Sequence, residues 1–389
     1  MQEGSGPSEV ENRILAKHVP ELDGIRGLAV LSVMLFHQTV LIPVTSFDRG
    51  FVAFSQMLQY GVDLFFVLSG YLITGILYYS KPTQHYYRNF YARRTLRIFP
   101  LYYLILFLAF VVLPSFQHSK AEKWGHTTGS SQIYYWLFLS NWFIALSGFG
   151  PRNGLVDLSW TLAIEEQFYL TWPVIVRSFI LQQLQRICYF VLAFSVLTRI
   201  LLSVFNAPTI WSWMLTPAHL DGLAIGSWIA LASRVPGRLQ KISHLAGWIL
   251  PASLLLLGIP YLLPSGGGVA LFKITTVCIP LIVSLACGSF LILSLTGARS
   301  SLLNRMLRSQ FLTLFGVFSY ALYLFHNPVQ ALLKGTLFPP SRFPTLFGSP
   351  LIGQLGFYII ATAITLPLAW LSWHLYEKRW LTLKRFFTS

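Results

Sequence analysis

Apolar segments of about 20 residues recur along the whole of this 389-residue chain. About 20 such residues cross the hydrocarbon core of a bilayer as a helix, so each segment predicts a membrane span. Charged residues make up only 11% of the chain, against about 25% in soluble domains. These features exclude a soluble enzyme, a disordered regulator and a DNA-binding domain. We expect an all-α, polytopic integral membrane protein with about ten transmembrane helices. The predicted spans are Leu22–Val44, Met57–Tyr79, Leu96–Phe116, Leu158–Val176, Ile187–Phe205, Pro217–Ala232, Leu245–Leu263, Lys273–Leu295, Phe311–Leu333 and Pro350–Leu375.

Basic residues gather in short segments between these apolar runs, and this pattern predicts the orientation of the chain. Positively charged loops stay in the cytoplasm, and the net charge of +15 arises largely from such clusters. Both termini are then cytoplasmic, and the apolar segment Tyr134–Phe149 is expected at the outer interface or as a re-entrant segment. The chain accordingly divides into a cytoplasmic lead-in (residues 1–20), a transmembrane domain (residues 21–377) and a basic cytoplasmic tail (residues 378–389).

Ionisable side chains within the spans are the candidate functional residues, because a charge at membrane depth costs several kcal/mol. At 1.5 Å per residue, His37 lies about 22 Å from the inner start of its span. His326 occupies the same position in the penultimate span, so the two histidines are predicted to be level. The carboxylates predicted in the same outer half are Asp63, Glu165, Glu166 and Asp221.

A neutral histidine beside a carboxylate can activate a hydroxyl group as a general base, with the carboxylate fixing the tautomer. His37, together with Asp63 or one of the two glutamates, fits this description. The alternative for each histidine is a hydrogen bond between packed helices. Asp63 could instead be a structural partner of Arg26 or of another cation.

Arginines near the inner ends of two spans form a second candidate feature. Arg26 precedes His37 by three helical turns plus about 20°, so both side chains share one helix face. Arg94 and Arg97 stand one turn apart where the third span begins. Two guanidinium groups at this spacing can clamp a phosphate, although anchoring at the cytoplasmic interface is the alternative.

A polar stripe marks the penultimate span, where Ser319, Tyr323, His326 and Asn327 follow the spacing i, i+4, i+7, i+8. In a membrane such a stripe faces a cavity or another helix. The three cysteines lie in apolar stretches, and no Cys/His spacing suggests a metal ligand set, so no metal is expected.

Five blocks of this sequence resemble acyltransferase family 3 of integral membrane proteins, whose best-known members O-acetylate bacterial surface polysaccharides. The blocks occur in family order and span nearly the whole chain. They are Leu22–Ala29 running on to Phe36-His37, Gly61–Thr74, Arg94–Tyr102, Leu158–Leu170 and Ser319–His326. Phe325 stands where the family often has tryptophan.

The resemblance implies an O-acyltransferase of the cell (inner) membrane. It would move an acyl group, with acetyl favoured, from acyl-CoA to a sugar hydroxyl of a cell-surface polysaccharide or glycoconjugate. Acyl-CoA is then the donor substrate, no cofactor stays bound, and nucleic acid is not a partner. The resemblance implies His37 as the catalytic base with Arg26 as its partner. It also implies that Arg94 and Arg97 handle CoA.

The acidic residue of the family corresponds to Glu165 or Glu166, of which Glu166 is favoured, and Asp63 could share its role. Candidates for contact with the acceptor or for lining a cavity are Ser69, Tyr323, His326, Asn327 and Asp221. CoA phosphates at the inner face would lie about 20 Å from His37. An extended pantetheine arm spans roughly that distance, and a covalent acyl relay stays open as an alternative.

Many family members carry a C-terminal SGNH hydrolase-like domain, whereas this sequence ends soon after the final span. We therefore expect a separate protein to handle the acceptor, or a reaction that needs none. Within the enzyme class, the alternative acceptor is a small glycosylated metabolite such as a macrolide sugar. The alternative from another class is a proton-coupled secondary transporter with His37, Asp63 and Glu166 as its relay. Transporters of that kind are built from inverted repeats with broken helices, which the sequence does not indicate.

Overall fold

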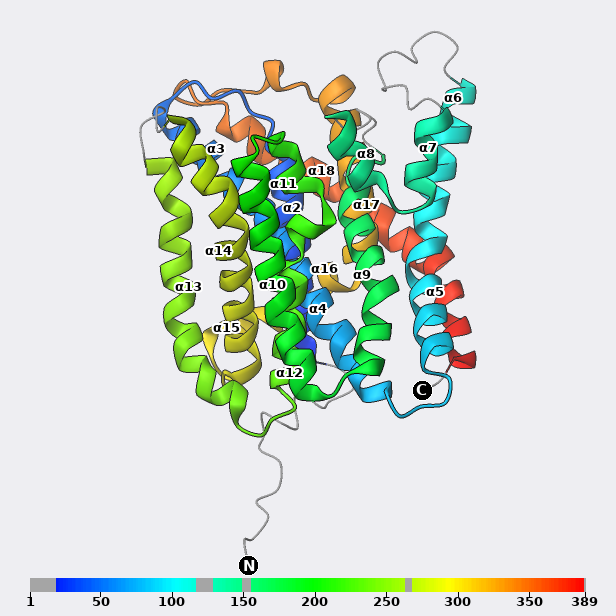
Figure 1. Ribbon diagram of the computed structural model, residues 1–389. Coiled ribbons are helices and arrows are strands. Elements are labelled where there is room, and N and C mark those ends of the chain that lie inside the picture. Colours follow the sequence, from blue (N-terminus) through cyan, green and yellow to red (C-terminus); the bar gives the residue numbers. More distant parts are fainter. Residues whose placement is uncertain (1–18, 117–128, 149–154, 263–267, 388–389) are drawn as a thin grey trace, which may run out of the picture. The chain divides into compact units, whose positions relative to one another are not determined.

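The computed structural model describes residues 19–116, 129–148, 155–262 and 268–387, so most of the predicted lead-in lies outside the described residues. Within these ranges the chain is almost entirely helical and forms no β-sheet (Figure 1). The chain is therefore an all-α membrane protein, as predicted. Among the described residues, six helical stretches are long and apolar enough to cross a membrane: Ser46–Ser80, Tyr86–Val112, Leu181–Val204, Arg238–Ile259, Lys273–Thr296 and Leu351–Phe386.

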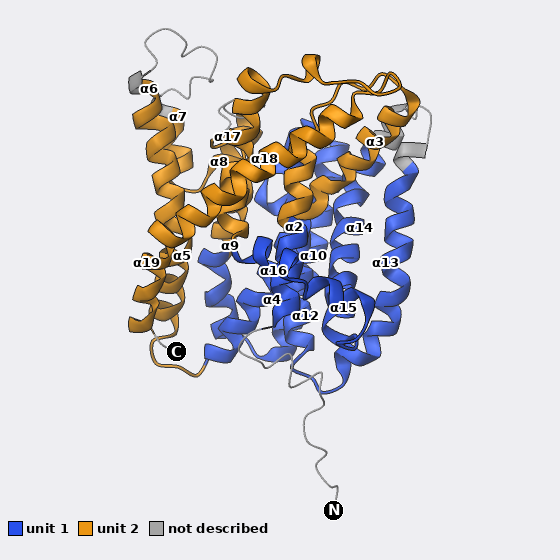
Figure 2. Cartoon of the chain, turned by 180° about the vertical axis from the view of Figure 1, so that it is seen from behind, with its two compact units in different colours: residues 1–29, 63–81, 169–317 blue, residues 30–62, 82–168, 318–389 orange. Residues whose placement is uncertain are grey.

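The chain folds into two compact units, and each of them combines segments that are distant in sequence (Figure 2). Unit 1 comprises residues 1–29, 63–81 and 169–317, and unit 2 comprises residues 30–62, 82–168 and 318–389. The boundary divides three helices between the units: α2 (Pro20–Gln38), α4 (Gly61–Ser80) and α9 (Ser159–Ser178).

Unit 1 is held together by close approach of helix backbones. A β-carbon at Gly70 of α4 would lie 2.1 Å from the Leu223 carbonyl oxygen of α12, and one at Gly226 would lie 1.9 Å from the Val67 carbonyl oxygen. Only glycine, which has no β-carbon, permits such contact. Close packing of this kind stabilises the association of membrane helices, which the hydrophobic effect does not drive. The other helices of this unit are α10 (Leu181–Val204), α11 (Thr209–Met214), α12 (Asp221–Ala232), α13 (Arg238–Leu262), α14 (Gly268–Thr296), α15 (Leu302–Leu307) and α16 (Gln310–Val317).

Unit 2 has its own apolar core, in which Leu41, Val329 and Phe357 are buried. A buried glutamine of α18 fixes the end of α2, because Gln354 Oε1 accepts hydrogen bonds from the backbone amides of Val40 and Leu41, both at 2.9 Å. The helices of this unit are α3 (Ser46–Met57), α5 (Tyr86–Phe107), α6 (Leu113–Phe116), α7 (Gly129–Trp136), α8 (Ser140–Ser147), α17 (Ser319–Leu332), α18 (Leu351–Ser372) and α19 (Lys378–Thr382).

Two predicted spans differ from the structure. The segment Phe311–Leu333 is two helices, α16 and α17, because Phe318 has φ −94° and ψ 8° and interrupts the helix. The segment Pro217–Ala232 begins with a 3₁₀ turn at Thr216–His219 and leaves only the 12 residues of α12. Twelve residues rise about 18 Å, which is less than the roughly 30 Å of a bilayer core. Average hydropathy does not register such breaks, because it ignores backbone conformation.

The apolar segment Tyr134–Phe149 is also divided, into the eight-residue helices α7 and α8, and neither is long enough to span a bilayer. The turn between them contains Phe138 with a left-handed φ of 54°. Phe138 stacks on Tyr102 of α5 with ring centroids 4.3 Å apart, and Gln167 Nε2 of α9 donates to the Phe138 carbonyl oxygen at 2.9 Å. These contacts hold the unusual backbone in place. Phe149 lies outside the described residues.

Candidate functional site

Two histidines from opposite ends of the chain meet in unit 2. His37, near the end of α2, places its Nδ1 atom 3.3 Å from Nε2 of His326 on α17, and the ring centroids are 5.2 Å apart. His326 is fully buried, whereas His37 is partly exposed. The prediction that the two residues lie level is confirmed.

Backbone carbonyls assign the tautomer of each ring. His326 Nδ1 lies 3.0 Å from the Leu322 carbonyl oxygen, and His37 Nδ1 lies 3.0 Å from that of Val33. Because a carbonyl oxygen only accepts, each Nδ1 of the neutral rings carries the proton. His326 Nε2 is then an acceptor for the His37 Nδ1 proton. His37 Nε2 is left unprotonated, and no described residue forms a hydrogen bond to it.

The end of α2 is fixed around this pair. Gln330 of α17, one turn after His326, donates its side-chain amide to the His37 carbonyl oxygen. Gln354 Nε2 donates to the Gln38 carbonyl oxygen at 2.9 Å. Carbonyls at a helix end have no partner within the helix, so these side chains satisfy them and hold the His37 backbone.

The two glutamates of α9 have different neighbours. Thr161, one turn before Glu165, forms a 2.7 Å hydrogen bond with the hydroxyl of Tyr323, whose ring centroid lies 5.8 Å from that of His326. Glu165 therefore lies on the face of α9 that is turned towards the histidine pair, and its charge acts on Tyr323. Of the predicted stripe, α17 carries Ser319, Tyr323 and His326 as buried side chains and Asn327 as a partly buried one.

Glu166 follows about 100° further round the helix and lies in the field of Arg94. Its Oε1 atom is buried and has no hydrogen-bond partner among the described residues. The sequence favoured Glu166 as the acidic residue of the family, although both glutamates fitted. The structure associates Glu165 with the histidine side of unit 2 and Glu166 with the arginine side.

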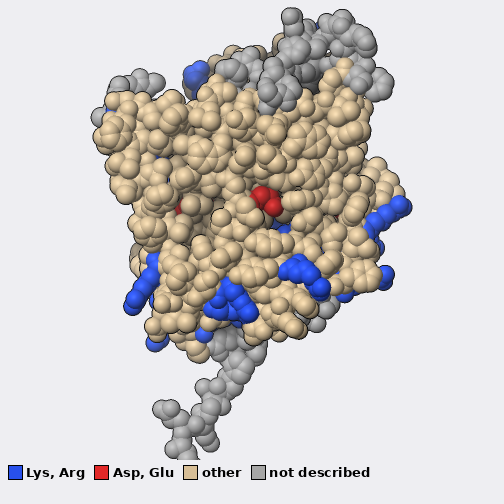
Figure 3. All heavy atoms as spheres, turned by 45° about the vertical axis from the view of Figure 1, so that its right-hand side comes forward, with Lys and Arg blue, Asp and Glu red and all other residues tan. Residues whose placement is uncertain are grey.

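Four basic side chains, which we call the cation cluster, gather along the first half of α5: Arg93, Arg94, Arg97 and Lys384. The charges of Arg93, Arg94 and Arg97 all act on Lys384, which belongs to the 3₁₀ turn Leu383–Phe386 near the C-terminus. This turn and α19 pack against α5 (Figure 2). On the face drawn in Figure 3, lysine and arginine side chains lie mainly in a band below a broad belt of uncharged residues, and an acidic side chain shows within the belt. Four gathered cations can bind a polyanion. Sequence reasoning found the arginines but assigned Lys384 only to the tail.

The remaining candidates lie in unit 1. Arg26 Nη1 is 3.1 Å from Asp23 Oδ1, and the two residues form an ion pair across one turn of α2. Tyr169 donates its hydroxyl to Ser69 Oγ at 3.0 Å. Asp63 Oδ1 lies 3.6 Å from Nε2 of His219, so its described neighbour is this histidine.

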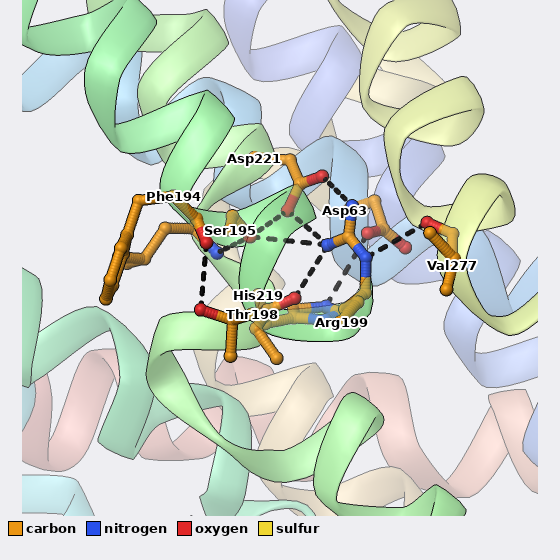
Figure 4. A network of polar contacts seen from close by, with 10 residues as sticks. Asp63, Phe194, Ser195, Thr198, Arg199, His219, Asp221 and Val277 are labelled. Atoms are coloured by element: carbon orange, nitrogen blue, oxygen red, sulfur yellow. Dashed lines mark hydrogen bonds and ion pairs between the residues drawn. The ribbon is translucent and has the colours of Figure 1, made fainter. Parts of the chain in front are cut away.

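Asp221 is part of a buried network that sequence reasoning missed (Figure 4). Arg199, which is 0% exposed, makes two 2.7 Å hydrogen bonds to the Asp221 carboxylate. Ser195 donates to Asp221 Oδ1 at 2.6 Å, and Arg199 also donates to the carbonyl oxygens of Ala218 and Val277. The sequence did contain a signal for this network. Arg199 lies within the predicted span Ile187–Phe205, and an ionisable residue inside a span is a functional candidate.

Comparison with known proteins gives a consistent family. Residues 19–374 match the acyltransferase domain of acyltransferase family 3. The chain is 29% identical over 390 residues to YrhL of Bacillus subtilis, named a putative peptidoglycan O-acetyltransferase, covering 93% of this chain and 55% of YrhL. It is 35% identical over 176 residues to the peptidoglycan O-acetyltransferase OatA of Listeria monocytogenes, covering 43% of this chain and 26% of OatA.

The chain therefore spans about half, or less, of the length of these relatives. No solved structure is significantly similar to it. The family match nevertheless covers nearly all of the chain and includes both the histidine pair and the cation cluster up to Arg97. This chain belongs to acyltransferase family 3 of integral membrane proteins.

Proposed function

We propose that this chain is an O-acyltransferase that uses acyl-CoA, with acetyl-CoA favoured, to acylate a sugar hydroxyl of a bacterial cell-surface polysaccharide. The names of the relatives make a peptidoglycan sugar the first acceptor to test. The observation that carries the proposal is the histidine pair, whose hydrogen bonds leave His37 Nε2 unprotonated and available as a base.

His37 acts as the general base in this reaction. Its Nε2 atom takes the proton of the acceptor hydroxyl while the hydroxyl oxygen attacks the thioester carbonyl carbon. The tetrahedral intermediate collapses, the carbon–sulfur bond breaks, and the imidazolium returns the proton to the CoA thiolate. His326 is a positioning residue, because its Nε2 lone pair accepts the His37 Nδ1 proton and stabilises the imidazolium. Glu165, on the same side of unit 2, adds a negative charge that favours this cation.

Within the cation cluster, Arg94, Arg97 and Lys384 bind the phosphates of CoA. Each guanidinium group can donate two parallel hydrogen bonds to a phosphate, and the tail lysine adds a further donor. Glu166, which lies in the field of Arg94, belongs to this donor side of unit 2. Roles for Arg26 as the partner of His37 and for Asp63 as a second acidic residue belong to the same proposal and rest on the family resemblance.

The proposed topology places both the lead-in and the basic tail in the cytoplasm. The helices α2 and α9, with 19 and 20 residues, reach the roughly 30 Å of a bilayer core although polar residues lower their hydropathy. A cytoplasmic tail would present Lys384 on the side where acyl-CoA is made. The pantetheine arm then carries the acyl group towards His37.

The test uses purified protein in nanodiscs with acetyl-CoA, and release of the CoA thiol is the readout. Wild type is compared with His37→Ala and Arg97→Ala, with and without peptidoglycan fragments, and His244→Ala on the exposed face of α13 is the matched control. We expect acceptor-dependent thiol release in wild type and in the control only. Release with a small glycoside but not with peptidoglycan fragments would reassign the acceptor. No release and no CoA binding by calorimetry would refute the proposal.

A further inference from the structure

An apolar cavity of about 210 Å³ lies within unit 1, between α10, α12, α13 and α14. Leu192, Ile225 and Ile249 are among the side chains that line it. Two other lining residues, Tyr189 and Leu245, are 54% and 60% exposed, so the cavity opens at the surface of these helices. In a membrane span such a surface faces lipid, and the opening is therefore accessible to lipid chains.

Two buried hydrogen-bond donors accompany this cavity. Trp228 lines it, and its indole Nε1 is buried without an acceptor among the described residues. The side-chain amide nitrogen of Gln185, one turn of α10 before Tyr189, is likewise buried and has no described partner. A buried donor without an acceptor costs about 1–3 kcal/mol, so one such donor in the cavity wall and a second one turn from a lining residue suggest an absent acceptor.

A guanidinium group completes the arrangement. Arg238, the first residue of α13, lies over the Trp228 ring with its Cζ atom 5.6 Å from the ring centroid, and its Nη1 atom donates to Gln185 Oε1 at 3.1 Å. Among the described residues no carboxylate forms an ion pair with Arg238. Its charge is therefore available for an anion at the cavity.

We propose that unit 1 holds a specific site for an anionic phospholipid of the surrounding bilayer. One acyl chain occupies the apolar cavity, and the phosphate lies against Arg238. The indole of Trp228 and the amide of Gln185 donate to the oxygens of the headgroup region. From Arg238 to Ile249 the cavity wall follows α13 for about 16 Å. Its polar end at Arg238 matches a lipid headgroup, and its apolar end at Ile249 matches an acyl chain.

Charge and depth favour a phospholipid. Arg238 lies in the basic cluster Arg234/Arg238/Lys241, which the orientation rule places at the cytoplasmic interface, at headgroup level. A basic residue near an anionic membrane surface contributes about 1 kcal/mol, which corresponds to about fivefold in affinity. A polyprenyl phosphate would present the same phosphate and chain chemistry, so the test includes it as a competitor.

The experiment is native mass spectrometry of the full-length protein in detergent, titrated with phosphatidylglycerol or with phosphatidylcholine of the same chains. We expect wild type to retain one phosphatidylglycerol about fivefold more tightly than phosphatidylcholine. Arg238→Gln should remove this preference. Lys378→Gln, which neutralises an exposed residue of α19 outside this basic cluster, should keep it. Trp228→Phe keeps an aromatic ring at this position but removes the indole N–H, and it should weaken retention of both lipids.

Three results would overturn the assignment. Equal retention of the two lipids by wild type would remove the anion preference, and an unchanged preference in Arg238→Gln would place the lipid elsewhere. Displacement of phosphatidylglycerol by a much lower concentration of polyprenyl phosphate would assign the site to that lipid instead. These measurements require no acyltransferase activity, so they are independent of the proposed reaction.

Discussion

The Nδ1 atom of His37 and the Nε2 atom of His326 lie 3.3 Å apart, although 289 positions separate the two residues in the chain. Each ring also donates through Nδ1 to the carbonyl oxygen one turn earlier in its own helix. Each of the two helices thus contributes a carbonyl oxygen and an imidazole ring to one set of hydrogen bonds. This relationship gives His37 a defined tautomer without a carboxylate in direct contact with its ring.

His326→Ala should lower kcat by about ten- to a hundredfold with little change in the KM for acetyl-CoA, because His37 Nδ1 then keeps only the Val33 carbonyl oxygen as acceptor and loses the imidazole that stabilises the imidazolium. His326→Gln places an amide oxygen near the same position and should recover much of the activity. The measurement is thiol release as a function of pH. A structural role would lower activity equally at every pH, whereas loss of the His37 partner should move the acidic limb of the profile, where the general base becomes protonated. Wild-type kcat in His326→Ala would contradict the assignment.

The two glutamates should separate kinetically. Glu165→Gln alters the histidine side of unit 2 and should lower kcat, whereas Glu166→Gln alters the surroundings of Arg94 and should change the Kd for CoA with little effect on kcat. Steady-state kinetics and calorimetry with CoA measure these effects. The reverse assignment, with kcat lost only in Glu166→Gln, would show that the face of α9 bearing Glu166 meets the reacting groups.

Lys384→Gln should weaken CoA binding about tenfold, because the cluster loses one charged donor to phosphate. Lys378→Gln, on the exposed side of α19, is the matched control and should leave the Kd unchanged. Binding by wild type should also weaken as salt rises. If both lysine variants bind CoA as wild type does, the tail takes no part in the donor site.

The Arg199–Asp221 pair should stabilise unit 1 only as a pair. Arg199→Met or Asp221→Asn alone should lower the free energy of unfolding by about 3–5 kcal/mol, because each leaves a buried charge or donor set without its partner. The double variant Arg199→Met/Asp221→Leu should be more stable than either single variant. Thermal unfolding in detergent measures this coupling. Additive losses in the double variant would show that the two residues stabilise the unit independently.

Much of the fold follows from composition and hydropathy, since a bilayer tolerates only long apolar helices with internally satisfied backbones. The depth of His37 and His326 was predictable for the same reason, because the rise per residue of a helix is constant. Hydropathy could not predict the breaks at Phe318 and before α12, which depend on backbone angles and on the buried Arg199–Asp221 pair.

The sequence by itself determined the membrane class, the acyltransferase family, and which residue types were available for chemistry. Only the tertiary structure decided which of them meet. It paired His37 with His326, gave Glu165 and Glu166 different neighbours, and brought Lys384 to the arginines of α5. Spacing along one helix fixes faces and depths, but contacts between helices depend on side-chain packing across segments that the sequence places hundreds of residues apart.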